Sequence, residues 1–338
     1  MTKTALPIRR LTITALLLCL VAVLALAGAF ARFDAALSAR RMALAPRPAT
    51  GDVVFVAIDK QSLDAIGVWP WDRSIYAGLI DRLASANARD IFFDIDFSAR
   101  SSLESDERLR QSLEAAGGGV VLPSFTQYRS NGDHRDLTGV TAPNAIFADH
   151  AWIASVSLSA DADGIVRRFP YGEQQGDGFV MSVPATLAGV AERQAAPFVI
   201  DFSIDPGTVP QYSLIDVFSG RVDALAFADK IVVIGASAIE LKDNFFVPVH
   251  GLVSGPMIQI IATETLLQNR VLTPLSAFPL LLMAGLVGFA ALSPRRSLRL
   301  QSLWIGTTVI GLEGAAFWLQ SAHGLILPTV PAHALLGL

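Results

Sequence analysis

The hydrophobic positions separate a central region of short apolar runs from two longer apolar stretches, at residues 11–31 and from residue 275 onward. In the centre, Val53–Ile58 and residues 91–97 are rich in β-branched and aromatic residues, and residues 74–86 between them have helical apolar spacing. Two buried strands joined by a helix predict a βαβ unit with parallel strands. The sequence therefore predicts an α/β domain with a mostly parallel sheet, accompanied by α-helical transmembrane segments.

The rest of the central region can be divided by the same criteria. Residues 105–116 are predicted to be a helix, and the polar, turn-rich residues 128–137 an exposed loop. Residues 152–158 and 165–171 flank a Ser-Ala-Asp-Ala-Asp-Gly turn, which predicts a hairpin. Residues 179–192 are predicted to be a helix.

Carboxylates follow both strands of the predicted βαβ unit: Asp59 after the first, and Asp94 and Asp96 at the end of the second. Ligands of open α/β sheets bind at the carboxyl ends of the strands. Because Asp94 and Asp96 are two positions apart, a strand would project them from the same face, and clustered carboxylates suit Mg²⁺ or Ca²⁺. The alternative is that these acids cap helices, pair with Arg73 or fix loops.

Several of these segments together resemble a known signature over residues 32–272. The matching pieces are Asp59, Gly67-Val68-Trp69-Pro70-Trp71-Asp72-Arg73, Asp94-Ile95-Asp96-Phe97, Asp163-Gly164-Ile165-Val166-Arg167-Arg168, and the run from Lys230 to Ser237 followed by Asp243. In this order they resemble the CHASE2 domain, an extracytoplasmic sensor module. The family usually has a His in its last helix, in a Pro-Gly-x-x-x-His-Ala pattern, and Gln259 takes that place here.

The resemblance implies a sensory module that passes a signal through membrane helices to a cytoplasmic effector: an adenylate or guanylate cyclase, a kinase or a diguanylate cyclase. The expected partners are the lipid bilayer, an unidentified small-molecule or protein signal, the effector and a second copy of the chain. The residues that we take as candidates for ligand binding are Asp59, Trp69, Trp71, Arg73, Asp94, Asp96, Ser237 and Asp243.

Four apolar segments are candidates for membrane spans: residues 11–31, 275–292, 303–320 and the shorter 325–338. Basic residues precede the first, and three arginines lie between 293 and 302, so residues 1–10 and 293–302 are expected in the cytoplasm. Residues 32–274 then form a periplasmic domain of a multi-pass protein in the bacterial inner membrane. Because the last segment is too short to cross unaided, we expect a longer chain or a truncated gene product.

Two features of these segments have competing interpretations. The Ala29-Phe30-Ala31 ending would also fit a cleaved signal peptide, although the apolar run is longer than a typical signal core. Glu313 lies within the third span, where an ionisable group is a functional candidate. The alternative, which we favour, is a Glu that faces another helix, with Gly306, Gly311 and Ala315 allowing close approach.

Composition limits the chemistry that these residues can perform. The net charge is −4 without a dense basic cluster, which argues against nucleic acid, and Cys19 is the only cysteine, so a cysteine-rich zinc site is excluded. Ser237 follows a strand as a nucleophilic serine would, but Ile239 stands where that motif has its second glycine. Kinase motifs and a P-loop are lacking. We therefore expect no enzyme, metal or cofactor within these residues.

Two alternatives to a sensor remain. A membrane-anchored periplasmic hydrolase would use Asp59, Asp94 and Asp96 around a divalent cation. An interaction or assembly module would dock a partner on Trp69 and Trp71, although the same tryptophans could plug the core. If the chain is a sensor, residues 255–270 are the expected mechanical element, moving relative to residues 32–45.

Overall fold

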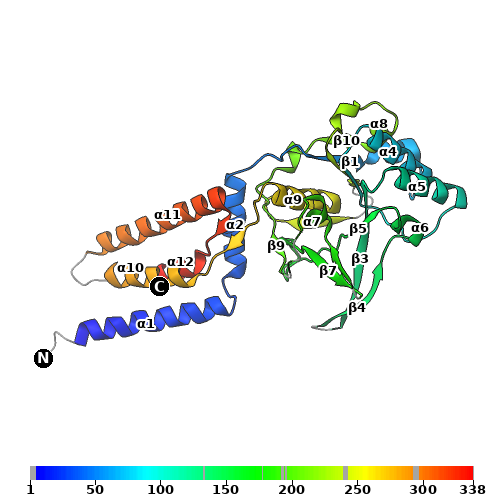
Figure 1. Cartoon of the computed structure of the whole chain (residues 1–338). Helices are drawn as coiled ribbons and strands as arrows, with labels where there is room; N and C mark the ends of the chain where they lie inside the picture. Colours follow the sequence, from blue (N-terminus) through cyan, green and yellow to red (C-terminus); the bar gives the residue numbers. More distant parts are fainter. Residues whose placement is uncertain are drawn as a thin grey trace. The chain divides into compact units, whose positions relative to one another are not determined.

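The computed structural model describes residues 5–131, 134–176, 178–191, 194, 196–238, 243–291 and 297–337. Lys3, Ile239, Arg295 and Arg296, which the sequence analysis uses, lie outside the described residues, as do Glu192 and Leu338 at the ends of two predicted segments. The chain divides into two compact units (Figure 1). One is Pro46–Val271, and the other combines Met1–Ala45 with Leu272–Leu338.

The first unit is built on a mainly parallel sheet. Its parallel strands follow one another in the order β10, β1, β11, β2, β3 and β5, and β4 pairs antiparallel with β3. Their bounds are β10 Gln211–Ser213, β1 Val53–Ile58, β11 Ile231–Ala236, β2 Asp90–Phe93, β3 Val120–Asn131, β5 Trp152–Ser155 and β4 His134–Thr141. The predicted α/β class with a mostly parallel sheet is confirmed, and β11 lies between the two strands of the predicted βαβ unit.

Helices cover the sheet because its strands are apolar on both faces. On one face α4 (Arg73–Ser85), α5 (Leu103–Ala115) and α8 (Leu214–Phe218) bury a cluster that includes Val54, Val56 and Ile234. Toward the opposite face lie α9 (Gly255–Leu267), which packs on β1 and β11, and α7 (Val183–Leu187), which packs on α9 (Figure 1). Every residue from Gly255 to Thr265 is buried, which makes α9 a core helix.

Three predicted segments differ in the structure: the hairpin, the loop at 128–137 and the helix at 179–192. β5 pairs with β3, and β6 (Arg168–Phe169) pairs with β9 (Phe198–Val199), so residues 152–158 and 165–171 form no hairpin. The predicted loop at 128–137 consists of the ends of β3 and β4 wherever it is described.

The predicted helix at 179–192 begins instead as a strand, β8 (Gly178–Met181), which pairs with β7 (Gly172–Gln175). The short helix α7 follows, with Ser182 as its cap and Pro184 as its second residue. A serine cap and a proline in the first turn favour a helix that starts at Val183, so the strand β8 ends at Met181.

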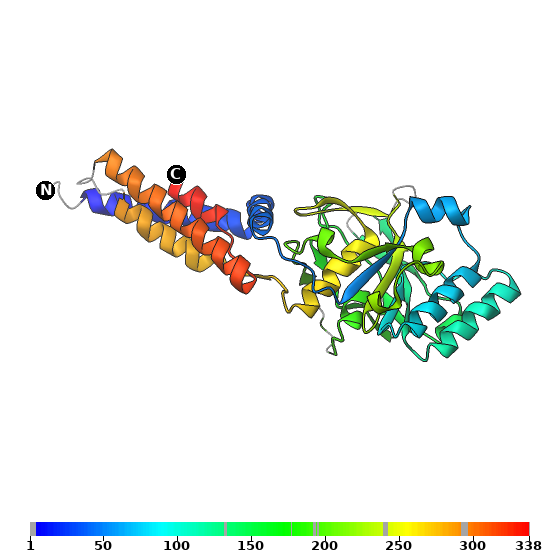
Figure 2. The ribbon, with the colours of Figure 1, turned by 90° about the horizontal axis from the view of Figure 1, so that it is seen from above.

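The second unit is helical. It contains α1 (Ala5–Leu26), α2 (Ala31–Leu44), α10 (Phe278–Ala291), α11 (Leu298–His323) and α12 (Val330–Gly337), with a short parallel pair of β14 (Thr273–Pro274) and β15 (Leu325–Ile326) (Figure 2). Among the described residues, α11 is long and apolar enough to cross a membrane. A second candidate is the run through α1 and α2, which is bent by 78° at its break, and α10 is a shorter apolar helix.

Glu313 on α11 has close partners within this helical unit. Its Oε2 atom lies 2.9 Å from a guanidinium nitrogen of Arg41 on α2, and Arg41 is only 5% exposed. Arg41 also donates to the Thr329 hydroxyl at 2.6 Å, and the His333 ring nitrogen Nε2 lies 3.2 Å from the Glu313 carboxylate. The sequence analysis did not identify Arg41, which joins α2 to α11 and to the segment before α12.

Candidate functional site

A cavity of about 690 Å³ opens at the carboxyl edge of the sheet. Its walls come from the residues that follow β2 and β5, from the middle of β3, from the loop before β12 (Asn244–Val247), and from the start of α9. This is the edge at which open α/β sheets bind ligands. The lining combines apolar side chains, among them Phe125 and Phe245, with the three carboxyl groups of Asp94, Glu173 and Asp243.

Asp94 and Asp243 form the acidic end of this cavity. Asp94 comes directly after β2, and its backbone N–H donates to the Ile234 carbonyl at 2.7 Å, which fixes it beside β11. Burial, together with the negative charge of Asp243, raises the pKa of Asp94 to about 7, and burial raises the pKa of Asp243 as well. Near neutral pH this carboxyl pair therefore holds a proton that a bound cation could displace.

Two glycines allow α9 to approach these carboxyl groups. A Cβ atom at Gly255 would overlap the Asp243 carboxylate, and one at Gly235 would lie 2.5 Å from Pro256 Cγ and 3.1 Å from Asp94 Cβ. Gly235 is therefore needed for close packing between β11 and the start of α9. The Gly255 N–H donates to the Asp243 carbonyl at 2.9 Å, which connects the helix start to the acidic end of the cavity.

Glu173 on β7 supplies the third carboxylate of the cavity. Its Oε1 atom accepts four side-chain hydrogen bonds, from Ser155 at 2.6 Å, Ser157 at 2.7 Å, Thr126 at 2.8 Å and Gln175 at 2.8 Å. Burial alone would raise the pKa of Glu173, but these donors outweigh it and hold the pKa below its ordinary value. Glu173 is thus a preorganised anion at neutral pH.

Gln259 on α9 lines the same cavity and has an unsatisfied side-chain oxygen. The residue is only 1% exposed, and its Nε2 atom donates a long hydrogen bond of 3.5 Å to the Val156 carbonyl. Within the part of the chain that the structure describes, its buried Oε1 atom has no hydrogen-bond partner. Buried polar atoms are nearly always paired in proteins, so an orphaned acceptor in a cavity marks a place for a donor.

The structure brings two of the predicted site residues together in this cavity, Asp94 and Asp243, and places the others elsewhere. Asp59 caps α3 (Lys60–Ile66): its Oδ1 atom accepts from the Ser62 N–H at 2.9 Å, the Ser62 hydroxyl at 2.7 Å and the Ser213 hydroxyl at 2.8 Å. The Ser237 hydroxyl lies 3.5 Å from the Ile58 carbonyl. The alternative in which Asp59, Asp94 and Asp96 surround one cation does not fit the described residues, because the three acids lie in different places.

The expectation that Asp94 and Asp96 share one face of a strand is wrong. β2 ends at Phe93, so both acids lie beyond the strand and its alternation no longer applies. Asp96 is exposed, accepts from the Ser98 N–H at 2.8 Å and lines a second hollow of about 540 Å³. Trp69, Trp71 and Arg73 line this second hollow as well.

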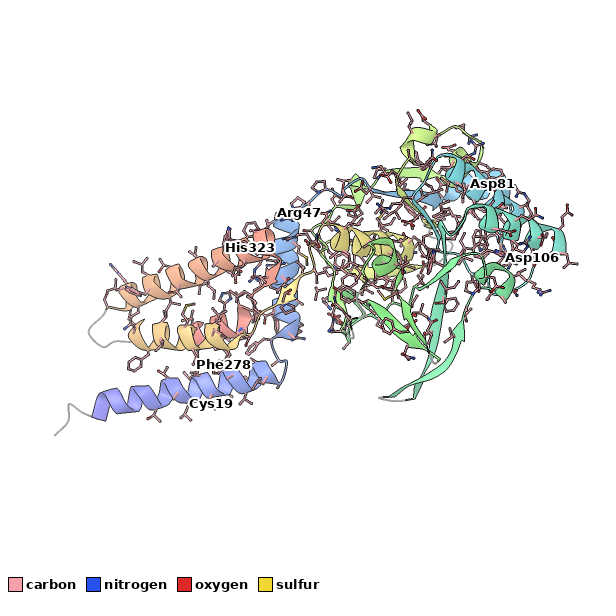
Figure 3. All side chains as sticks on the ribbon, viewed as in Figure 1. Cys19, Arg47, Asp81, Asp106, Phe278 and His323 are labelled. Carbon is pink, nitrogen blue, oxygen red and sulfur yellow. The ribbon has the colours of Figure 1, made fainter. Side chains whose placement is uncertain are left out.

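The tryptophans and the arginine of this second hollow have partners, whereas the buried Tyr76 hydroxyl, which also lines it, has no hydrogen-bond partner among the described residues. Trp71 is buried, its ring lies edge to face with Trp69 at 5.1 Å, and its Nε1 atom donates to the Gly67 carbonyl at 3.0 Å. Arg73 is 7% exposed and forms an ion pair with Asp106, which lies in the first turn of α5 (Figure 3).

Arg73 has further partners in the core. It donates to the Ala99 carbonyl, and its guanidinium carbon lies 4.9 Å from the centre of the Phe147 ring. With both terminal nitrogens of the guanidinium bonded, Arg73 fixes the start of α4 to the rest of the fold.

Glu173 was missed by the sequence analysis because its role depends on long-range contacts. Its donors come from β3, from the end of β5 and from β7 itself. No local spacing links these positions. The identity of Gln259, in contrast, was noted as a departure from a family pattern, and its place in the cavity is what the structure adds.

The fold and the cavity define an α/β domain with a cavity at the carboxyl edge of its sheet. A comparison with protein families matches residues 14–293 to the CHASE2 domain. The match covers most of the chain, and the chain therefore belongs to the CHASE2 family, whose members are extracellular sensory domains. Comparison with curated proteins found no match, and neither did comparison with solved structures.

Proposed function

We propose that residues 46–271 form an extracytoplasmic sensor, which detects its signal in the cavity at the carboxyl edge and relays it to a cytoplasmic effector through membrane helices. The observation that carries the proposal is the course of α9. The helix begins at the cavity, with Gly255 and Gln259 in its wall. Its other end, about 20 Å further along the axis, holds the chain segment that enters the unit.

The contact at that far end is built from a buried carboxylate. Glu264 is fully buried and accepts from the Thr50 N–H at 2.9 Å, the Thr50 hydroxyl at 2.8 Å and Gln268 Nε2 at 3.0 Å. Gln268 also donates to the Pro48 carbonyl at 3.2 Å. The unit ends at Val271, directly after this helix. A shift of α9 at the cavity would therefore move both points where the chain enters and leaves the unit.

Hydrogen exchange of the purified chain in detergent, with a library of small metabolites, tests this relay. A ligand that binds the cavity should change exchange at the cavity wall and also at residues 46–50, because the Thr50 amide is bonded to Glu264. Cavity binding is established by its loss in the Asp94→Asn variant. A ligand that meets this criterion and leaves residues 46–50 and the end of α9 unchanged would contradict the relay.

The location is tested separately with reporter fusions. The reporter is an enzyme that is active only outside the cytoplasm. Inserted at the exposed Gly176 between β7 and β8, it should be active. Fusions at Arg299, in the first turn of α11, should give the opposite result if the predicted cytoplasmic loop is right. A cytoplasmic signal from the Gly176 fusion would overturn the sensor proposal, whatever the cavity binds.

The multi-pass arrangement, the effector classes and the homodimer remain part of this proposal. Their support is the family, the apolar helices and the paired Arg41 and Glu313 in the helical unit. A buried ion pair of this kind suits helices that pack against each other. The proposal assigns no reaction to these residues, and the catalytic step belongs to the effector.

A further inference from the structure

We infer that the cavity takes a small organic cation, a primary amine whose ammonium group binds Asp94, Asp243 and the orphaned oxygen of Gln259. The inference rests on the proposed function, because it names the class of ligand for the same site. It begins from the acceptors that converge there. An ammonium group has three N–H donors and no acceptor, and the cavity offers two carboxyl groups and one unpaired amide oxygen.

Charge favours a cation over other ligands. Asp94, Asp243 and Glu173 all line the cavity, and no Arg, Lys or His among the described residues does so. The two aspartates repel each other when both are ionised, which a bound cation would relieve. An anion would meet like charge on both sides of the cavity and would leave the Gln259 oxygen unpaired.

Size and lining favour an organic cation over a metal ion. The cavity of about 690 Å³ lies within the range of sites for small molecules, far above the volume of a bare ion. Phe125, Phe245 and Leu158 give it apolar walls on which a hydrocarbon stem could pack. The described residues contain no cluster of three or more His, Cys, Asp or Glu side chains that could hold a metal. Glu173 offers a second anionic pole, which a diamine could reach.

Thermal shift and calorimetry of the full chain in detergent at pH 8 test the assignment. The probes are butane-1,4-diamine, spermidine and phenethylamine, with butane-1,4-diol as a neutral control of matched length and with Ca²⁺ and Mg²⁺ as metal controls. At least one amine should raise the melting temperature, and the diol and the metals should not. Asp94→Asn and Gln259→Leu should each weaken amine binding by about tenfold or more, because a desolvated partner is lost.

Asp96→Asn is the matched control variant, since it removes the same charge two residues away in the other hollow. It should bind the amine as the wild type does, within about twofold. Amine binding that survives in both Asp94→Asn and Gln259→Leu overturns the inference, as does a response to Ca²⁺ or Mg²⁺ in place of the amines. No response to any of the amines also overturns it. In all three cases the sensor proposal still stands or falls by the exchange and fusion experiments.

Discussion

The two hollows beside the end of β2 differ in how their charged groups are paired. In the hollow around Arg73, the guanidinium is neutralised by Asp106 and held by a carbonyl and an aromatic ring. In the cavity, Asp94 faces another acid and Gln259 keeps an unpaired oxygen. Residues as close in sequence as Asp94 and Asp96 contribute to these opposite environments. The comparison teaches that a buried carboxyl group facing another acid indicates a binding site better than acids that merely cluster in sequence.

The largest expected effect belongs to the satisfied hollow. Arg73→Met should destabilise the fold by about 3–5 kcal/mol, because it leaves Asp106 charged and buried without a partner. Chemical denaturation followed by circular dichroism measures this change. Arg73→Met combined with Asp106→Leu should recover most of the loss. If Arg73→Met alone is as stable as the wild type, the Arg73–Asp106 pair does not hold this hollow together.

The next effect concerns the acidic end of the cavity. The folded-state pKa of Asp94 is about 7 and its ordinary value is 3.8, so the folded state binds the proton more tightly than the unfolded state does. Its contribution to stability is therefore present at low pH and is lost as the pH rises through 7. We expect about 2–3 kcal/mol between pH 5 and pH 8, since one pKa unit corresponds to about 1.4 kcal/mol and about two units separate pH 5 from the folded-state pKa of about 7.

Unfolding free energies at pH 5 and pH 8 measure this contribution in the wild type and in Asp94→Asn. The change in unfolding free energy from pH 5 to pH 8 should be smaller in Asp94→Asn than in the wild type by that amount. In Asp96→Asn the change should equal that of the wild type. Equal pH dependence in wild type and Asp94→Asn would show that the carboxyl is not perturbed.

Glu173 sharpens the comparison because it lies in the cavity but is fully paired. Glu173→Gln should cost about 1–2 kcal/mol at pH 7, since four donors lose a charged acceptor. Its folded-state pKa lies below the ordinary 4.5, so its contribution is present above that value and disappears as the pH falls further. Unfolding at pH 7 and pH 3 should show the variant approaching the wild type at the lower pH. A constant gap would contradict the assignment.

The smallest effect is expected where an ion pair is exposed. Arg108 on α5 pairs with Asp81 on α4, labelled in Figure 3, and both side chains are more than one-third exposed. Arg108→Met should change the unfolding free energy by less than about 1 kcal/mol, because solvent screens the pair. Denaturation under the same conditions as for Arg73→Met makes the two arginines directly comparable. A loss as large as that of Arg73→Met would mean that burial does not separate the two pairs.

Local patterns predicted much of the fold. The strands β1, β2 and β11 are visible in the sequence as short continuous apolar runs, and the helix α4 as apolar residues at helical spacing. The hairpin expected at 152–158 and 165–171 was wrong because β5 finds its partner in β3, about 30 residues away. Asp94 was identified from its place at the end of a predicted strand and Asp243 from the family resemblance, whereas Glu173 depends on donors from three elements that only the fold brings together.

The hydrogen bonds from Thr50 to Glu264 also have a consequence for how such proteins evolve. They hold the first residues of the α/β unit next to its last helix, so the two ends of the unit lie close together in space. Domains whose ends lie close together tolerate transplantation. This unit is thus a self-contained cassette, which recombination could insert between two helices, or remove again, without lengthening the path between them.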